Sequence, residues 1–580
     1  MVISTESRLQ ILGLLDQLYG PEAPGCLERI EDVIARYPEL GTKPRDDLWN
    51  QRDVLLITYA NQVRWPECVP LEALKRFLVD YNLAGLFSTI HLLPFFPYSS
   101  DDGFSVIDYR QVDPKMGDWE SVARLGESFD LMIDLVLNHC SRRHRWFEGF
   151  LAGELWYARY FVTADSSADL SQVARPRSTP LLTACTTADG LKQVWTTFSE
   201  DQVDLNWANP DVLLEMLDIL LSYVSRGARF IRLDAVAYLW KRPGTSCIHL
   251  AETHAVVKLL RAVLDAAAPG TLLVTETNVP HEENISYFGQ GDEAHVVYQF
   301  SLAPLLLDAI LSGDASVLSK WMRSLRLDRP RTTFLNFTAS HDGIGMRPLE
   351  GLLPADRAER LIETVRSRGG LVSTRRQPDG SDTPYELNIT YFSALADPDR
   401  PPEDQARAML LSQAVMLALR GIPAVYFHSL VGTPNYMEGV TELSSNRAIN
   451  RRQFDREELS AMVASPGSAQ QIIFDEYRRM LAVRVRQPAF HPDGPQDVLV
   501  ASHPAVLAVR RTSPDGQQQV LLLANLSTHG VEFAVDGATP ESLSWNLLTG
   551  AVHTGADRWR LGPHEVAWMT TPSGTPREGP

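Results

Sequence analysis

Residues 228–236 have the sequence ARFIRLDAV, an apolar and β-branched run that single charged residues interrupt. Seven further runs of this kind occur along the chain, and helical patterns separate most of them. Buried parallel strands have this near-continuous apolar character because both of their faces are covered. Eight strand–helix units in succession predict an α/β fold, a (β/α)8 barrel. The predicted strands are VLLITYA (54–60), GLFSTIHLLP (85–94), LMIDLVLNH (131–139), ARFIRLDAV (228–236), TLLVTETN (271–278), HVVYQFS (295–301), TFLNFTASHD (333–342) and PAVYFHSL (423–430).

The spacing of these runs predicts additional domains. Two segments, 140–210 and 343–402, are too long for a simple connection, and both leave the carboxyl end of a strand. Long excursions of this kind are usually lids or small inserted domains, so we expect two of them beside the site. Short alternating runs over 489–572 predict an antiparallel β-domain, and residues 1–53 have helical spacing. The barrel is then expected over 54–139, 211–342 and 403–488, with a disordered tail at 573–580.

The composition excludes several classes of function. The chain has 580 residues, 44% of them hydrophobic and 22% charged, which is ordinary for a globular protein. Its net charge of −18 argues against binding to nucleic acid, which usually requires a basic surplus. No apolar run of about 18 residues and no signal-peptide pattern occurs, so we expect a cytoplasmic protein that does not associate with membranes.

Metal sites and bound cofactors are not expected from the sequence. The five cysteines are scattered and include no CxxC pair, which argues against a disulfide framework or a thiolate zinc site. The segment HEEN (281–284) lacks the HExxH pattern of a metalloenzyme. No glycine-rich phosphate-binding loop for a nucleotide occurs either. The sequence leaves the oligomeric state open.

Ionisable residues gather at one edge of the predicted barrel. A single carboxylate at a strand end is often only a cap or part of a salt bridge. Three carboxylates with two histidines and an arginine at the same edge are different, because like charges are costly to collect without a ligand or a reaction. Barrel enzymes build their active sites at this edge, so the cluster predicts a catalytic centre. Its members are His139, Arg232, Asp234, Glu276, His341 and Asp342.

Four short segments resemble the α-amylase superfamily, glycoside hydrolase family 13. They are DLVLNH (134–139), RFIRLDAVAY (229–238), TETN (275–278) and FTASHD (337–342). The resemblance covers roughly residues 54–572. It is greatest for the sucrose-phosphorylase-like subfamily, which is similar in ITYANQV (57–63), HLLPFFPYSSDDGFSVIDYRQVDPKMGDW (91–119), RLDAVAYLWKRPGTSC (232–247) and HDGIG (341–345).

The resemblance implies a role for each residue that matches a family motif. Asp234 corresponds to the nucleophile, Glu276 to the general acid/base, and Asp342 to the carboxylate that stabilises the transition state. Other matching residues hold the sugar ring or close the pocket around one glucosyl unit. These are Asp101, Phe104, His139, Arg232, Tyr238, His341 and Arg447.

The chemistry of the reaction agrees with these roles. Cleavage of an α-glucoside with retention requires two carboxyl groups about 5–5.5 Å apart, one ionised and one protonated. Arg232 precedes Asp234 by two residues, so both side chains point to the same face of their strand. We expect this guanidinium to lower the pKa of Asp234, and the neighbouring carboxylates to raise the pKa of Glu276.

The similar phosphorylases transfer the glucosyl group to inorganic phosphate, which is here a co-substrate and not a bound cofactor. Phosphate is an anion that enters a site lined with carboxylates, so it requires a local cation. The resemblance implies Arg177, in the segment RPRSTP of the first insertion, for this task.

The acceptor side departs from the sucrose phosphorylases. The histidine that they have two places after the acid/base is Asn278 here. In TPYELNITYF (383–392), Thr383 and Glu386 replace the family's Asp and Gln, while Tyr385 is retained. The segments ETNVPHEEN, GIGMRPLEG and TPYELN resemble instead the glucosylglycerate phosphorylases, whose acceptor glycerate is a small carboxylate. Loop cations that could bind it are Lys241, Arg242, Arg375 and Arg376.

The sequence therefore predicts a retaining phosphorylase that acts on a small α-glucoside, with 2-O-α-glucosylglycerate as the preferred substrate. Phosphorolysis of sucrose, sucrose 6′-phosphate or glucosylglycerol is the alternative. A hydrolase or transglucosidase with the same carboxylates is a further alternative, as is a non-catalytic amylase-like subunit.

Overall fold

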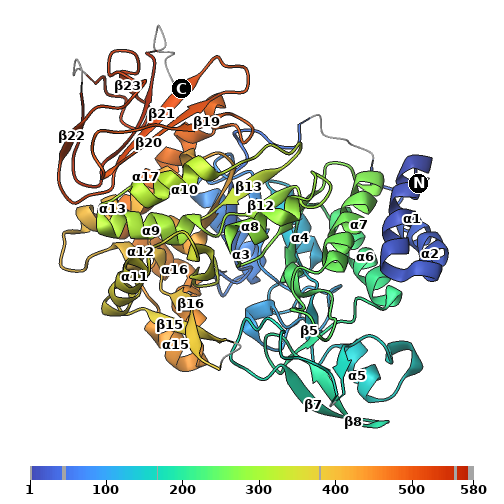
Figure 1. The fold of residues 1–580 in the computed structure, drawn as a ribbon. Helices are drawn as coiled ribbons and strands as arrows, with labels where there is room; N and C mark the ends of the chain where they lie inside the picture. Colours follow the sequence, from blue (N-terminus) through green and yellow to red (C-terminus); the bar gives the residue numbers. More distant parts are fainter. Residues whose placement is uncertain (1–2, 42–46, 166, 378–379, 554–557, 573–580) are drawn as a thin grey trace.

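Eight parallel strands close into a barrel at the centre of the molecule (Figure 1). The computed structural model describes residues 3–41, 47–165, 167–377, 380–553 and 558–572. Each barrel strand overlaps one of the eight predicted runs, so the predicted fold is confirmed. The strands are β1 (Leu55–Thr58), β3 (Thr89–Leu92), β4 (Asp130–Val136), β10 (Ala228–Asp234), β11 (Leu272–Thr275), β12 (Val296–Tyr298), β13 (Thr333–Asn336) and β17 (Ile422–Tyr426).

Helices between the strands cover the barrel with apolar faces. The helix α6 (Pro210–Ser225) begins with a proline, and Asn209 is its N-cap. Proline suits this position because the amide hydrogens of a first helical turn have no partner within the helix, and proline has none. Its leucines Leu213, Leu217 and Leu220 are fully buried. The other long helices around the barrel are α3 (Pro70–Asp80), α4 (Trp119–Gly126), α7 (Ala251–Ala267), α9 (Leu302–Ser312), α10 (Ser316–Ser324), α13 (Pro402–Ala418), α16 (Arg456–Ala464) and α17 (Ala469–Arg484).

The first long excursion, over 140–210, forms small sheets beside the barrel (Figure 1). One sheet has the order β6-β8-β7, and β5 pairs with β9. The pair β5–β9 brings His139 opposite Asp204, so this excursion begins at the site edge of the barrel. Its elements are β5 (His139–Ser141), α5 (Arg145–Leu151), β6 (Thr163–Ala164), β7 (Leu182–Thr187), β8 (Gly190–Trp195) and β9 (Gln202–Asp204).

The second excursion contains a three-stranded sheet in the order β14-β16-β15. A bulge interrupts the pairing of β15 with β16, because Ser373 lies opposite Glu386 but Thr374 lies opposite Pro384. Tyr385 is therefore the extra residue of the bulge. The elements are β14 (Ile344–Gly345), α11 (Ala355–Ser367), β15 (Leu371–Arg376), β16 (Asp382–Asn388) and α12 (Tyr391–Leu395), and the later α15 (Met437–Leu443) and η7 (Asn446–Asn450) pack near them.

Both ends of the chain attach to the outside of the barrel. The N-terminal helices α1 (Thr5–Tyr19) and α2 (Ala23–Ala35) pack on α7 and α6, and the Tyr19 hydroxyl donates to the Trp207 carbonyl at 3.0 Å. The C-terminal region forms an antiparallel sheet with its own apolar cluster around Phe533 and Trp559. This five-stranded sheet has the order β19 (Gln496–Val498), β20 (Val506–Thr512), β21 (Gln519–Asn525), β25 (Val566–Thr570) and β23 (Trp545–Asn546), and β22 (Val531–Phe533) pairs separately with β24 (Trp559–Leu561).

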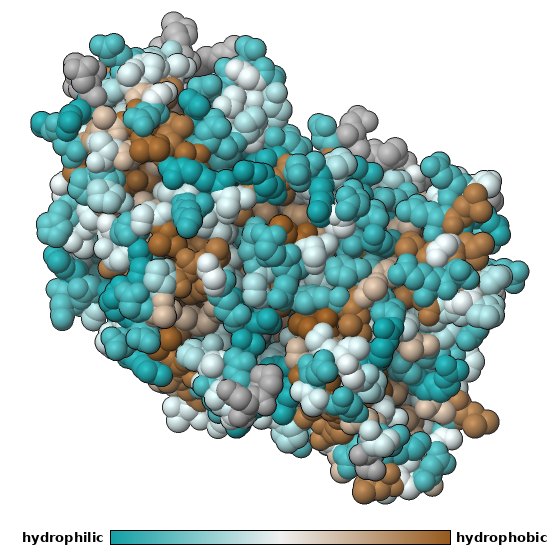
Figure 2. Space-filling model, in the orientation of Figure 1, coloured by the Kyte–Doolittle hydropathy of each residue, from teal (hydrophilic) through white to brown (hydrophobic). Residues whose placement is uncertain are grey.

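Hydrophilic side chains cover most of the face in Figure 2, with small apolar areas between them. Within the described ranges no helix is long and apolar enough to cross a membrane. The cytoplasmic location stays a prediction. The tail that we expected to be disordered, residues 573–580, lies outside the described residues.

Candidate active site

A cavity at the carboxyl ends of the barrel strands collects most of the predicted site residues. The three carboxylates line it, together with eleven other residues that the sequence singled out or that the two excursions contribute. Arg232 lies directly beneath it, because it precedes the strand end. The lining residues used below are Asp101, Phe104, His139, Arg177, Gln202, Asp234, Tyr238, Glu276, Asn278, His341, Asp342, Tyr385, Glu386 and Arg447.

Arg232 is the centre of a buried ion network. Its Nη1 contacts Asp134 and lies 2.8 Å from Asp234 Oδ1, while its Nη2 lies 3.9 Å from Glu276 Oε2. Asp134 lies opposite Arg232 on the neighbouring strand β4, and its other oxygen contacts His91 Nε2 at 2.7 Å. One guanidinium thus fixes Asp134 and the predicted nucleophile Asp234 at the same time.

Strand register brings Asp234 and Glu276 together. Leu233 of β10 pairs with Thr275 of β11, so the next residue on each strand reaches the same level of the rim. Ala235 has a left-handed backbone, with φ of 52°, which strains a residue that has a Cβ. In that conformation its amide donates to Glu276 Oε2 at 3.4 Å. The turn after Asp234 therefore helps to orient the second carboxylate.

The pKa of Asp234 is raised, where the sequence predicted that Arg232 would lower it. Burial raises the pKa of Asp234 and outweighs the opposing effect of Arg232, and the Glu276 carboxylate adds to the rise. Burial also raises the pKa of Glu276, as does Asp342. Two close carboxyls with raised pKa values titrate as a pair and keep one proton between them. Since Arg232 contacts Asp234 more closely, we assign the negative charge to Asp234 and the proton to Glu276.

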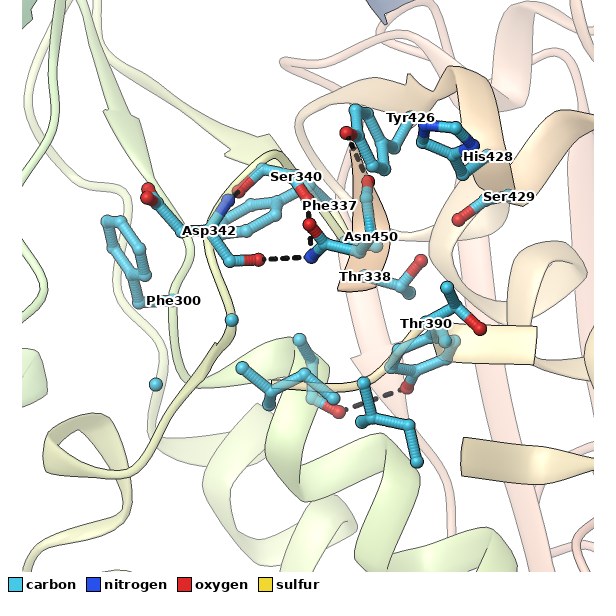
Figure 3. Close-up of a pocket in the computed structure, with 17 residues that line it drawn as sticks. Phe300, Phe337, Thr338, Ser340, Asp342, Thr390, Tyr426, His428, Ser429 and Asn450 are labelled. Carbon is cyan, nitrogen blue, oxygen red and sulfur yellow. Dashed lines mark hydrogen bonds between the residues drawn. The ribbon is translucent and has the colours of Figure 1, made fainter. Parts of the chain in front are cut away.

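Asp342 lies on a loop whose backbone carbonyls accept hydrogen bonds from neighbouring side chains (Figure 3). Asn450 Nδ2 donates to the carbonyls of Asp342 at 2.8 Å and Ser340 at 3.3 Å, and Arg451 Nε donates to the His341 carbonyl at 2.8 Å. Burial opposes the charge of Asp342, but Arg447, at 2.6 Å from its Oδ1, and the other basic groups around it together outweigh burial, so its pKa is lowered. Asp342 is thus the carboxylate that stays ionised.

Aromatic and histidine side chains form the inner end of the cavity. The Phe104 ring stacks on His341, with ring centres 4.6 Å apart. His139 Nε2 lies 3.0 Å from the Phe104 carbonyl and 3.2 Å from Gln202 Nε2. Burial lowers the pKa of His139, and it lowers that of His341 to about 3. Both imidazoles are neutral at physiological pH and serve as hydrogen-bonding groups, as a sugar pocket requires.

The outer end of the cavity contains the predicted acceptor residues Arg177, Asn278, Tyr385 and Glu386. The Arg177 guanidinium lies over the Tyr385 ring at 5.4 Å and has no hydrogen bond or ion pair within the described part of the chain. Tyr385 and its neighbour Glu386 both face the cavity, although successive strand residues normally point to opposite faces. The bulge at Tyr385 explains this arrangement.

Glu386 is not available to an acceptor. It is 1% exposed, and its two oxygens accept hydrogen bonds from Arg447 at 2.7 and 3.1 Å. Arg447 therefore connects Glu386 with Asp342. The ion pair with Arg447 explains why the negative charge of Glu386 is tolerated beside the three other carboxylates.

The other predicted acceptor residues lie away from the cavity. Arg375 contacts Glu350 at 2.8 Å, and Arg376 contacts Asp382 at 3.0 Å. Thr383 lies opposite Arg375 at the far end of the β15–β16 ladder, and its hydroxyl accepts from Gln377. Their nearness in sequence to Tyr385 was misleading, because the hairpin extends outward from the site.

The predicted loop cations Lys241 and Arg242 are also engaged elsewhere. The Lys241 ammonium is 3% exposed and lies 2.7 Å from Asp204 Oδ2 and 2.5 Å from Asn138 Oδ1. It joins the first excursion to the end of β4, so it is a structural cation. Arg242 contacts Glu252.

Three residues of the site were missed in the sequence. Asp134 was detectable as a lone charge within the apolar run LMIDLVLNH, since a buried charge needs a partner. Arg451, in NRAINRR (446–452), contacts Asp101 at 3.4 Å and Asp102 at 2.6 Å. Gln202 gave no sequence signal. No group of three or more His, Cys, Asp or Glu suited to a metal ion occurs in the described ranges, and the expectation of no metal stays a prediction.

Comparisons with known proteins agree with this geometry. A family model described as the α-amylase catalytic domain matches residues 80–341. The chain is 48% identical to the glucosylglycerate phosphorylase of Spirochaeta thermophila, over 96% of this chain and 97% of that protein. It is 44% identical to a protein of the same name from Allomeiothermus silvanus, over 98% and 99%.

A solved structure is similar as well. The crystal structure of sucrose 6F-phosphate phosphorylase from Thermoanaerobacter thermosaccharolyticum superposes with a TM-score of 0.72 and 25% identity, over 83% of this chain and 96% of that one. The chain therefore belongs to the α-amylase family, glycoside hydrolase family 13, within the branch that includes its glycoside phosphorylases.

Proposed function

We propose that the chain is a retaining glycoside phosphorylase that transfers a glucosyl unit reversibly between 2-O-α-glucosylglycerate and phosphate. The product of phosphorolysis is α-glucose 1-phosphate. One observation carries the reaction type: three largely buried carboxylates with different charge states face an arginine that has no ion pair among the described residues, across one cavity. The name shared by relatives 48% and 44% identical supports the substrate.

The first half of the reaction breaks the glycosidic bond. The Asp234 carboxylate attacks the anomeric carbon while Glu276 donates its proton to the leaving glycerate oxygen. A glucosyl ester of Asp234 forms with inverted configuration. Asp342 remains ionised beside the ring and stabilises the positive charge that develops on the sugar, since Arg447 keeps its pKa low.

The second half transfers the glucosyl group to phosphate. Glu276, now a carboxylate, accepts a proton from phosphate as a phosphate oxygen attacks the anomeric carbon. The ester bond to Asp234 breaks, and the second inversion gives net retention. The proton is back on Glu276, so the pair returns to its starting state.

Arg177 supplies the positive charge that phosphate needs among these carboxylates. Arg177→Ala is expected to raise the KM for phosphate about ten- to a hundredfold, because a charge-assisted contact is worth about 1.5–3 kcal/mol. The KM for the glucoside should change much less. Initial rates at varied phosphate check this, with Arg175→Ala in the same loop as the control. An unchanged phosphate KM would place the anion site elsewhere.

The acceptor site favours glycerate over fructose. Asn278 replaces a histidine of the sucrose phosphorylases, and Glu386 is occupied by Arg447. Fructose hydroxyls buried without partners cost about 1–3 kcal/mol each. With glucose 1-phosphate as donor, we expect phosphate release with glycerate to be far faster than with fructose, fructose 6-phosphate or glycerol. A preference for fructose would contradict the assignment.

A hydrolase with the same carboxylates is the second candidate, since water could replace phosphate in the second half. Arg177, which has no ion pair with any described residue, favours phosphate, because water needs no cation. Turnover that does not depend on phosphate would support the hydrolase.

A further inference from the structure

Arg347, in the segment GIGMRPLEG, is a guanidinium near the acceptor end of the cavity, and neither the predicted site residues nor the reaction steps above include it. Its side chain is only 14% exposed. Its Nε is buried and has no hydrogen-bond partner, and none of the described residues forms a hydrogen bond with the rest of this side chain. The nearest carboxylates are Glu283 at 3.6 Å and Glu350 at 3.9 Å. A buried guanidinium with unused donors is costly unless a ligand completes it.

Its carboxylate neighbours are only partial partners. Glu350 is already paired with Arg375 at the shorter distance of 2.8 Å. Glu283 is 44% exposed and lies 3.2 Å from His249 Nε2. Solvent and these other contacts weaken both interactions with Arg347. Its charge is therefore still available to an anion.

The backbone places Arg347 beside the acceptor wall. The strand β14 pairs with β16 through Gly345 and Glu386, and the Met346 amide donates to the Tyr385 carbonyl at 2.9 Å. Arg347 follows at once, so its backbone is anchored to the bulge that turns Tyr385 toward the cavity. Arg347 is not itself among the residues that line the cavity, and no hydrogen bond from the described residues fixes its side chain.

Asn278 lies against the same segment. A Cβ built on Gly345 would come within 2.4 Å of Asn278 Oδ1, so only glycine permits this approach. Asn278 Oδ1 is buried, and no residue in the described ranges forms a hydrogen bond with it. Burial raises the pKa of the Tyr238 hydroxyl in this wall, and both Arg347 and Arg177 oppose the rise, so both guanidinium groups act on the same wall of the cavity.

We propose that Arg347 binds the carboxylate of the acceptor and that Asn278 accepts a hydrogen bond from an acceptor hydroxyl. The two unpaired groups match the two kinds of polar group on a small hydroxy acid such as glycerate. Arg177, which belongs to the first excursion, then binds phosphate. Arg347 makes the enzyme selective for an organic acceptor that carries a carboxylate. This inference rests on the proposed function and names the residue that gives it its selectivity.

The experiment compares acceptors in the synthetic direction with glucose 1-phosphate as donor. Arg347→Gln removes the charge but keeps a polar side chain. We expect its kcat/KM for glycerate to fall about ten- to a hundredfold, while kcat/KM for glycerol, which has no charge, changes less than about threefold. Arg347→Lys should recover part of the preference for glycerate. Arg376→Gln, which removes an exposed ion pair with Asp382 on the neighbouring hairpin and leaves Glu350 paired with Arg375, is the matched control and should leave both values unchanged.

Equal losses for glycerate and glycerol, or no loss for glycerate, would overturn the assignment of Arg347. If Arg347→Gln is poorly folded, the Arg347→Lys variant decides, because an unaltered or fully lost glycerate preference contradicts the partial recovery that we expect. The wild-type protein separates this inference from the proposed function. If it does not use glycerate, both fail; if it does and Arg347→Gln keeps that preference, only the inference fails.

Discussion

Replacement of Asp234 by asparagine is expected to abolish glucosyl transfer while the barrel stays folded. The neutral amide cannot form the glucosyl ester, so the rate of phosphorolysis should fall by several powers of ten. An asparagine oxygen still accepts a hydrogen bond from Arg232, whose other partner Asp134 is unchanged. Phosphorolysis rates and the thermal unfolding midpoint together measure this result.

Asp189→Asn is the matched control for that change. Asp189 lies in the turn between β7 and β8, far along the first excursion, and its side chain is 69% exposed. Among the described residues, its carboxylate forms an ion pair only with Lys192. It should keep the wild-type rate. A folded Asp234→Asn protein with near-normal turnover would remove Asp234 from the role of nucleophile.

The second large effect concerns Glu276. Glu276→Gln has no proton to donate, so cleavage of glucosylglycerate, whose leaving group is poor, should fall by about 10²–10⁴-fold. Glucosyl fluoride needs little protonation and should still form the ester with Asp234. Mass spectrometry of the intact protein after mixing with glucosyl fluoride measures that ester. Equal losses with both substrates would contradict the acid role.

The pH dependence follows from the raised pKa of Glu276. Below that pKa the carboxyl holds the proton that cleavage needs, and as the pH rises through it the acid form is lost. The kcat/KM for phosphorolysis should therefore fall as the pH rises through the pKa of Glu276. It should also fall at low pH, where the Asp234–Glu276 pair takes up a second proton and Asp234 loses its charge. With Glu276→Gln and glucosyl fluoride, the alkaline fall caused by Glu276 should disappear. An identical alkaline fall in the variant would assign it to another group.

The barrel and its catalytic rim could be predicted because they follow from local rules. Buried parallel strands need continuous apolar runs, and their ends meet at one edge, so Asp234, Glu276 and Asp342 had to lie close together. The pairing of Leu233 with Thr275 agrees with this prediction, because it brings the next residues, Asp234 and Glu276, to the same level of the rim.

Properties that depend on tertiary contacts could not be predicted from the sequence. Arg375 and Thr383 are close to Tyr385 in sequence, but the bulge and the outward course of the hairpin separate them from the cavity. The pKa of Asp234 depends on how completely the rim is buried, which outweighs the expected effect of Arg232. Lys241 is bound by Asp204, a residue of the first excursion, and no local pattern indicates that contact.

The central claim is tested most directly by NMR of the products formed from 2-O-α-glucosylglycerate and inorganic phosphate. The proposed mechanism predicts α-glucose 1-phosphate and glycerate in equal amounts, with no reaction in the absence of phosphate. Free glucose formed at a rate that does not depend on phosphate would contradict a phosphorylase, and β-glucose 1-phosphate would contradict two inversions at Asp234.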